Sequence, residues 1–245
     1  MTIFRNVVFV AALAGLVAGL AMTAMQFFAT TPLIIQAEGY EETGAVAHAH
    51  AHDAEAGHAH DHGHSHSGWM PEDGFEREFY TGLANVVAAI GFGLILVVAS
   101  ELAGGIQNWR QGLYWGFAGF AIFTLSPGLG LPPELPGMPA ADFLARQAWW
   151  VATVGATAGG LALIAFGRNV LLAVIGVALI VVPHIVGAPQ PASHGTSVPL
   201  ELHSQFVTAV TLTSLVFWLI LGGMAGLLRE RFAMPEPSAE QRSLA

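Results

Sequence analysis

Long apolar stretches dominate this chain of 245 residues, and six of them are long enough to cross a lipid bilayer. A hydrocarbon core of about 30 Å needs roughly 20 apolar residues in a helix. The candidate spans cover about residues 7–35, 80–102, 112–131, 148–167, 170–187 and 205–228. The third is the weakest, because Ser126 and Pro127 interrupt its apolar run. The pattern predicts an all-α fold: one membrane domain that is a polytopic transmembrane helical bundle of about six spans.

The placement of arginine tests this span count and predicts the orientation. Short cytoplasmic loops carry an excess of positive charge. With six spans and a cytoplasmic N-terminus, the outer side holds only Arg77 and Arg146. The cytoplasmic side then holds Arg5, Arg110, Arg168, Arg229, Arg231 and Arg242. We therefore expect both termini in the cytoplasm, with residues 229–245 as a cytoplasmic tail. Five spans, and cleavage of the first span as a signal peptide, remain alternatives.

The composition excludes several function classes. All eight basic residues are arginine and no cysteine is present, so a Walker A lysine, a Schiff-base lysine and thiolate metal sites are absent. The net charge of -9 also argues against nucleic-acid binding. No nucleophile, base and substrate pocket can be assembled from the sequence, so we expect no enzyme activity.

The segment between the first two spans is rich in histidine and acidic residues. Residues 36–79 contain eight histidines: His48, His50, His52, His58, His60, His62, His64 and His66. Imidazole is the commonest metal ligand in proteins, and nearby carboxylates attract cations. Because the segment is poor in apolar residues, we expect a disordered extracytoplasmic loop that binds divalent transition metal. Such histidine tracts also occur as dispensable buffers, so an essential role in transport remains open.

A second group of candidate residues lies at the outer ends of the later spans. Glu134 sits in a proline-rich stretch after the third span, and Arg146, Trp149 and Trp150 open the fourth. Further candidates are His184, His194, Glu201 and His203. The histidines and carboxylates could gather around one Co²⁺, Ni²⁺ or Zn²⁺ ion. The two tryptophans are more typical of interfacial anchors.

Uncharged polar and small residues occur inside the spans, where no charged residue lies near the middle. Asn85, Thr153, Thr157, Thr208 and Thr211 could line a path, although such groups more often bond to neighbouring helices. Small residues four apart allow close helix packing and favour contacts within the bundle over a dimer face. They are Ala11, Gly15 and Gly19, then Gly155 and Gly159, then Gly222 and Gly226.

The motifs together resemble those of the CbtA family of predicted cobalt transporter subunits. The resemblance rests on residues 131–137 with Glu134, on residues 146–150, on Pro183-His184 with residues 187–191, and on the histidine-rich first loop. It covers nearly the whole chain. It implies a multi-pass protein of the bacterial inner membrane, linked with cobalt supply for cobalamin synthesis and acting beside CbtB, a small one-span partner. The family is usually described with about five spans.

These observations lead to one expectation and one alternative. We expect an integral membrane subunit of a divalent transition-metal uptake system, with Co²⁺ favoured, whose outer histidine-rich loop captures the metal. The alternative is a membrane-tethered metal-binding accessory or buffer that translocates nothing. The sequence leaves open the metal, the energy source, the need for the loop and the oligomeric state.

Overall fold

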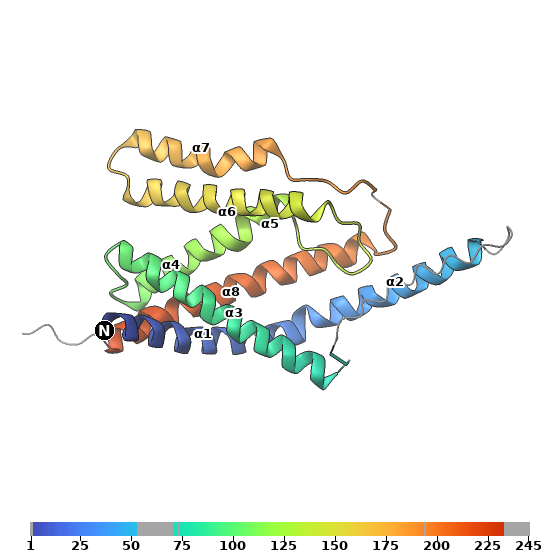
Figure 1. The fold of residues 1–245 in the computed structure, drawn as a ribbon, viewed down its shortest axis with the longest axis horizontal. Coiled ribbons are helices and arrows are strands. Elements are labelled where there is room, and N and C mark those ends of the chain that lie inside the picture. The colour runs from blue at the N-terminus through green and yellow to red at the C-terminus, as the bar shows by residue number, and fades with distance from the viewer. Residues whose placement is uncertain (1, 53–70, 73, 194, 233–245) are drawn as a thin grey trace, which may run out of the picture.

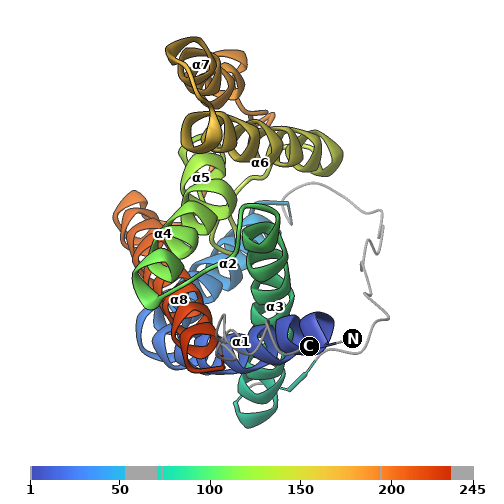
Figure 2. The same ribbon diagram turned by 90° about the vertical axis from the view of Figure 1, so that its left-hand side faces the viewer.

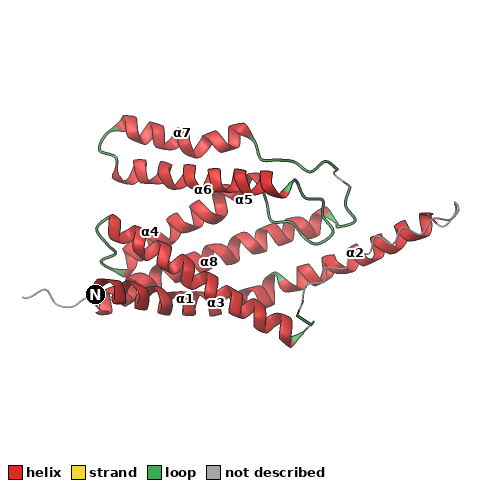
Figure 3. Cartoon of the chain, viewed as in Figure 1, coloured by secondary structure: helices red, strands yellow, loops and turns green. Residues whose placement is uncertain are grey.

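The computed structural model describes residues 2–52, 71–72, 74–193 and 195–232, and these residues contain helices and no strand (Figure 3). The described helices are α1 (Thr2–Ala29), α2 (Thr31–His52), α3 (Phe75–Leu102), α4 (Trp109–Phe120), the π-helix η1 (Ala121–Leu125), α5 (Ser126–Gly130), α6 (Phe143–Phe166), α7 (Val170–Val186) and α8 (Leu200–Phe232). The predicted all-α membrane bundle is confirmed.

Four described helices are long and apolar enough to cross a bilayer: α1, α3, α6 and α8. α7 is a shorter apolar helix. The remaining predicted span corresponds to α4, η1 and α5, which follow one another without a gap from residue 109 to residue 130. Every predicted span therefore coincides with a helical segment, while the number of crossings stays a prediction.

The helices alternate in direction, so the bundle has two distinct ends (Figure 1). One end, on the left in Figure 1, holds the start of α1, the α3–α4 and α6–α7 turns and the end of α8. We call it the arginine end, because Arg5, Arg110, Arg168, Arg229 and Arg231 belong to these elements. The opposite end, which we call the histidine end, holds α2, the start of α3, residues 131–142 and residues 187–200.

Glycines allow the closest helix contacts. Gly15 and Gly19 of α1 lie against the backbone of α3 at Ile90 and Val86. Gly222 of α8 lies against Gly112 and Gly116 of α4 in the same way. The prediction that these small residues serve packing inside the bundle is confirmed for the first and last groups.

The glycines of α6 behave differently from the other two groups. A Cβ atom on Gly155 or Gly159 would have no neighbour within 4 Å, whereas one on Gly160 would meet the carbonyl oxygen of Gly176 in α7. Gly160 therefore makes the close contact with α7, and the predicted packing role does not hold for Gly155 and Gly159 among the described residues.

The first predicted span is interrupted near its end. α1 ends at Ala29 and α2 begins at Thr31, where a continuous helix to residue 35 was expected. Pro32 is the reason: it has no N–H to donate to the carbonyl of Phe28, and its ring would clash with that carbonyl in a continuous helix. Beyond the break, Ala37 is buried against Leu135, Leu202 and Phe206. This contact anchors α2 to α8 and to the proline-rich lip, as we call residues 131–137.

Two boundaries of the predicted disordered loop are wrong. Residues 36–52 are helical, because α2 continues to His52 through an alanine-rich stretch with high helix propensity. α3 also begins at Phe75 rather than near Tyr80. Glu76 and Glu78 stand in its first turn, where carboxylates stabilise the positive end of a helix.

A π-helical turn lies inside the third predicted span. The N–H of Ser126 donates to the carbonyl of Ala121, and Pro127 contributes no N–H at all. The chain nevertheless stays helical to Gly130, so the irregular backbone begins only at Leu131. In Figure 2 the α6–α7 hairpin stands away from the other helices, and α5 lies between the hairpin and the rest of the bundle. This segment therefore connects the hairpin to the bundle.

Candidate functional site

The histidine-rich segment is only partly described. His48, His50 and His52 belong to the last turns of α2, which extends beyond the rest of the bundle at the histidine end (Figure 1). His58, His60, His62, His64 and His66 lie outside the described residues, and so does His194. The predicted metal capture by these eight loop histidines stays a prediction.

The proline-rich lip after α5 is held by polar contacts to α6 and α8. The carboxylate of Glu134 pairs with the guanidinium of Arg146 at 3.1 Å. His203 Nε2 lies 3.1 Å from the carbonyl oxygen of Pro133, so the protonated ring nitrogen donates to that carbonyl. Leu135 between them is buried in the apolar cluster with α2 and α8. Arg146 and His203 therefore fix the lip in place.

His184 lies in a separate cluster formed by three helices. Its Nε2 atom is 3.2 Å from the hydroxyl oxygen of Ser126 in α5, and the hydroxyl of Thr157 in α6 donates to the same oxygen at 2.8 Å. Ser126 and Thr157 are buried. These bonds join the α6–α7 hairpin to α5, so His184 has a structural role in holding the hairpin.

Trp149 completes this cluster, and its interpretation as an interfacial anchor is wrong. The side chain is only 9% exposed, and its indole N–H donates to the carbonyl of Pro183 at 3.2 Å. Its ring also meets that of His184 edge-on, with centroids 5.9 Å apart. α7 continues through Pro183 and His184 to Val186. The carbonyl of Pro183 accepts two hydrogen bonds, one from the indole N–H of Trp149 and one from the backbone N–H of Gly187. Trp150 is 37% exposed.

The described residues contain no group of three histidines or carboxylates that could hold a metal ion. Glu134 pairs with Arg146, His184 with Ser126 and His203 with the lip, while Glu201 accepts a hydrogen bond from Gln205 at 3.2 Å. The structure thus does not bring Glu134, His184, Glu201 and His203 together around one centre.

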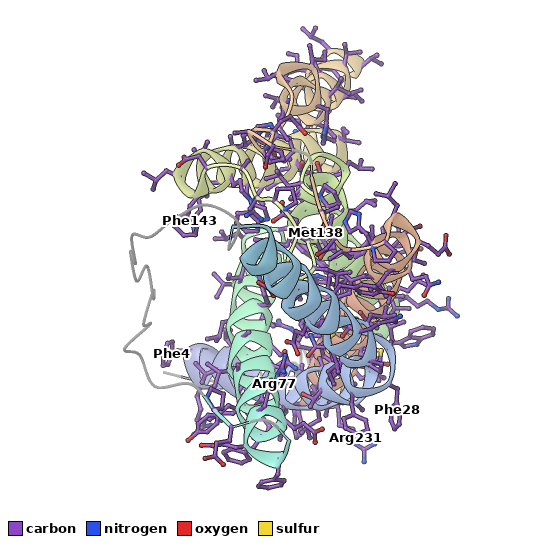
Figure 4. The ribbon with its side chains drawn as sticks, turned by 90° about the vertical axis from the view of Figure 1, so that its right-hand side faces the viewer. Phe4, Phe28, Arg77, Met138, Phe143 and Arg231 are labelled. Atoms are coloured by element: carbon purple, nitrogen blue, oxygen red, sulfur yellow. The ribbon has the colours of Figure 1, made fainter. Side chains whose placement is uncertain are left out.

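A cavity that sequence reasoning missed opens at the histidine end. Its volume is about 740 Å³, and it lies between the end of α1, the first turns of α2 and the start of α3. The polar residues that line it are Thr23, Gln26, Thr30, Thr31, Glu38, Arg77, Glu78 and Thr81. Glu38 and Arg77 form an ion pair of 2.6 Å at its mouth. Figure 4, viewed from the histidine end, shows Arg77 on α3 beside α2.

Asn85 bonds to two of the residues that line this cavity. Its amide nitrogen donates to the hydroxyl of Thr23 at 3.1 Å and to the side-chain oxygen of Gln26 at 2.7 Å. Asn85 also lines a second cavity of about 260 Å³, deeper in the bundle, together with Thr124 and Ser214. The sequence predicts Asn85 as a candidate for a path, and the amide of Gln26 within an apolar stretch is a second polar signal of the same kind.

The other polar candidates within the spans make simple contacts. Thr153, Thr208 and Thr211 each donate to the carbonyl four residues earlier in their own helix. Thr157 bonds across to Ser126, and Asn85 across to α1. The expectation that such groups bond to neighbouring helices is confirmed for Thr157 and Asn85 and is wrong for Thr153, Thr208 and Thr211, which bond within their own helix.

The fold defines a polytopic helical membrane protein, with four described helices long and apolar enough to cross a bilayer. The comparison with family models is more specific: residues 4–230 match the family described as "Probable cobalt transporter subunit (CbtA)". The chain belongs to the CbtA family, as its motifs indicated. No curated protein and no solved structure matches it.

Proposed function

We propose that this protein is the membrane subunit of an uptake system for a divalent transition metal, with Co²⁺ the favoured ion. Family membership supports a role in cobalt transport. The finer parts of the proposal are inward direction, capture by the histidine-rich segment, and a bacterial inner-membrane location with both termini in the cytoplasm. The role is transport rather than catalysis.

The observation that carries the proposed direction is the separation of charge and imidazole between the two ends of the bundle. Five of the arginines belong to one end, while α2 with the start of the histidine tract, His184 and His203 belong to the other. Because positive charge favours the cytoplasmic side, this arrangement supports outward-facing histidines. A metal-collecting tract on the outside serves uptake rather than export.

The proposed driving force is the membrane potential. One elementary charge moving through 100 mV is worth about 2.3 kcal/mol, and a divalent ion moving inward gains about twice that. The chain has no Walker A lysine for ATP hydrolysis. The word "subunit" in the family description implies a partner, and we propose a CbtB-like one-span protein in that role.

Single cysteines test the orientation directly, because the natural chain has none. Ala103→Cys probes the arginine end and Gln190→Cys the histidine end, and both positions are exposed. An impermeant maleimide added to intact spheroplasts should label Gln190→Cys and spare Ala103→Cys. Inverted vesicles should give the opposite pattern. Labelling of Ala103→Cys in intact spheroplasts would contradict the uptake proposal.

The second candidate function is a membrane-tethered metal-binding accessory. The absence of a three-ligand metal site among the described residues favours it. The two functions differ in one measurement: Co²⁺ accumulation inside sealed proteoliposomes containing the purified protein, with and without the one-span partner. Accumulation that needs the protein and a negative interior supports transport. Binding without accumulation in either arm supports the accessory role.

A further inference from the structure

Three side-chain oxygen atoms inside the spans have no hydrogen-bond partner within the described residues. They are the hydroxyls of Thr124 and Ser214 and the amide oxygen of Asn85. Neighbouring hydroxyls of α8 behave differently: Thr208, Thr211 and Thr213 all donate to carbonyls of their own helix. Such self-satisfaction is the normal way to hold Ser or Thr in a membrane helix.

These unpartnered groups belong to three different helices and line the same cavity. Thr124 comes from η1, Ser214 from α8 and Asn85 from α3, and the thioether-bearing Met22 of α1 joins them. None of the three atoms is fully buried, and all three side chains line this cavity. Because a polar group without a partner costs several kcal/mol in a dry apolar environment, we expect water or an ion to fill the cavity. Thr124 lies in the π-helical turn η1, and such turns often occur at functional sites.

The cavity of about 260 Å³, which we call the inner cavity, lies next to the cavity of about 740 Å³, the outer cavity. The outer cavity reaches Thr23 and Gln26, and Asn85 bonds to both of them while lining the inner cavity. The amide of Asn85 is therefore the divider between the two spaces. The outer mouth carries Glu38, Arg77 and Glu78, which together sum to one negative charge and so favour a cation.

Aromatic rings close the inner cavity toward the arginine end. Trp218 stacks on Phe123 with centroids 5.5 Å apart and meets Phe92 at 5.1 Å. Trp218 is buried, and the absence of a side chain at Gly119 leaves room for its ring. The two cavities are therefore adjacent, with Asn85 between them, and this aromatic cluster bounds the inner one.

We propose that the divalent ion crosses the membrane between α1, α3, η1 and α8, passing Asn85 and pausing beside Thr124 and Ser214. This inference rests on the proposed transport function and adds its path and its ligands. The ion keeps part of its hydration shell there, because the lining offers amide and hydroxyl oxygens without a carboxylate. Weak neutral ligands suit passage, since a transported ion must also leave. The cluster around His184 is a structural joint outside this route.

The first test is the accessibility of single cysteines to water. A thiol reacts as its thiolate, which forms in water and not in lipid. A small cationic methanethiosulfonate, added from the histidine side, should modify Thr23→Cys and Ser214→Cys. Leu212→Cys is the matched control, because it lies on the same helix with a side chain 57% exposed on the outer surface of the bundle.

The expected result is a modification rate for Ser214→Cys at least about tenfold above that of Leu212→Cys, slowed by excess Co²⁺. Equal rates for the two variants would overturn the path. This readout requires no metal flux, so it stands or falls separately from the proposed function.

The second test is Co²⁺ flux into proteoliposomes with Ser214→Val. The hydroxyl of Ser214 has no partner among the described residues, so its loss leaves folding contacts intact. We expect about a tenfold lower flux, whereas Thr208→Val, whose hydroxyl bonds only to its own helix, should stay within about twofold of wild type. If wild type shows flux and Ser214→Val shows the same flux, the proposed path is overturned while the proposed function stands. Absence of wild-type flux would contradict the proposed function instead.

Discussion

The contact between α4 and α8 gives a sharp prediction for stability. In Gly222→Ala the added Cβ atom would clash with the carbonyl oxygen of Gly112 and lie 2.7 Å from the Cα atom of Gly116. Both are backbone atoms, so no side chain can swing aside to make room. The two helices must move apart by about 1 Å to reach an ordinary van der Waals contact.

The magnitude follows from two opposing effects. Overpacking of this kind costs about 1–3 kcal/mol. Replacing glycine by alanine in a helix returns roughly 0.5–1 kcal/mol. We therefore expect Gly222→Ala to lower the free energy of unfolding by about 0–2.5 kcal/mol, with a central value of about 1 kcal/mol. Gly155→Ala is the matched control: its Cβ has no neighbour within 4 Å, so that variant should keep wild-type stability or gain up to about 1 kcal/mol.

The assay is reversible unfolding by SDS in mixed micelles, followed by tryptophan fluorescence, with both variants measured beside wild type. Trp218 lies on α8 one turn from Gly222 and reports the same interface. Equal unfolding free energies for Gly222→Ala and Gly155→Ala would refute the reasoning, because they would show that α4 and α8 do not approach as closely as the structure has them.

Three further predictions concern other contacts. Glu101→Gln weakens the ion pair with Arg229 that joins the ends of α3 and α8, and should lower stability by about 1 kcal/mol in the same unfolding assay, with the loss shrinking at high salt. Trp149→Phe removes the donor to the Pro183 carbonyl and should cost about 1–2 kcal/mol; an unchanged midpoint would contradict this bond. Replacing the eight histidines of residues 48–66 by glutamine should lower the number of Co²⁺ ions bound per chain in equilibrium dialysis while leaving the helical circular dichroism unchanged.

The spans could be predicted from the sequence because hydropathy over about 20 residues is a direct requirement of the bilayer. The break at Thr30 was readable from Pro32, but the length of the apolar run obscured it. Pro127 favours an end of the helix, yet a π-helical turn precedes it and the helix continues to Gly130. A proline in a membrane helix is tolerated when neighbouring groups satisfy the backbone, which depends on contacts that the sequence does not display.

The candidate site was harder to predict, since it depends on how each helix is rotated about its axis. Hydropathy identified Asn85 as a polar group in a span, yet gave no sign that it faces Thr23 and Gln26. The same limit applies to His184, which bonds to Ser126 rather than joining Glu201 or His203. The close approach of α4 to α8 at Gly222 matched its four-residue glycine spacing, whereas Gly155 and Gly159 carry the same spacing without such a contact.

The central claim is that this protein carries a divalent metal ion inward across the membrane. The most direct measurement is the initial rate of Co²⁺ uptake into proteoliposomes of the purified protein, with and without the one-span partner, as a potassium diffusion potential is varied. We predict a rate that rises as the interior becomes more negative and that stays above the rate of protein-free liposomes at zero potential, where the inward Co²⁺ gradient is the remaining driving force. A rate equal to that of protein-free liposomes at every potential, in both arms, would contradict the central claim.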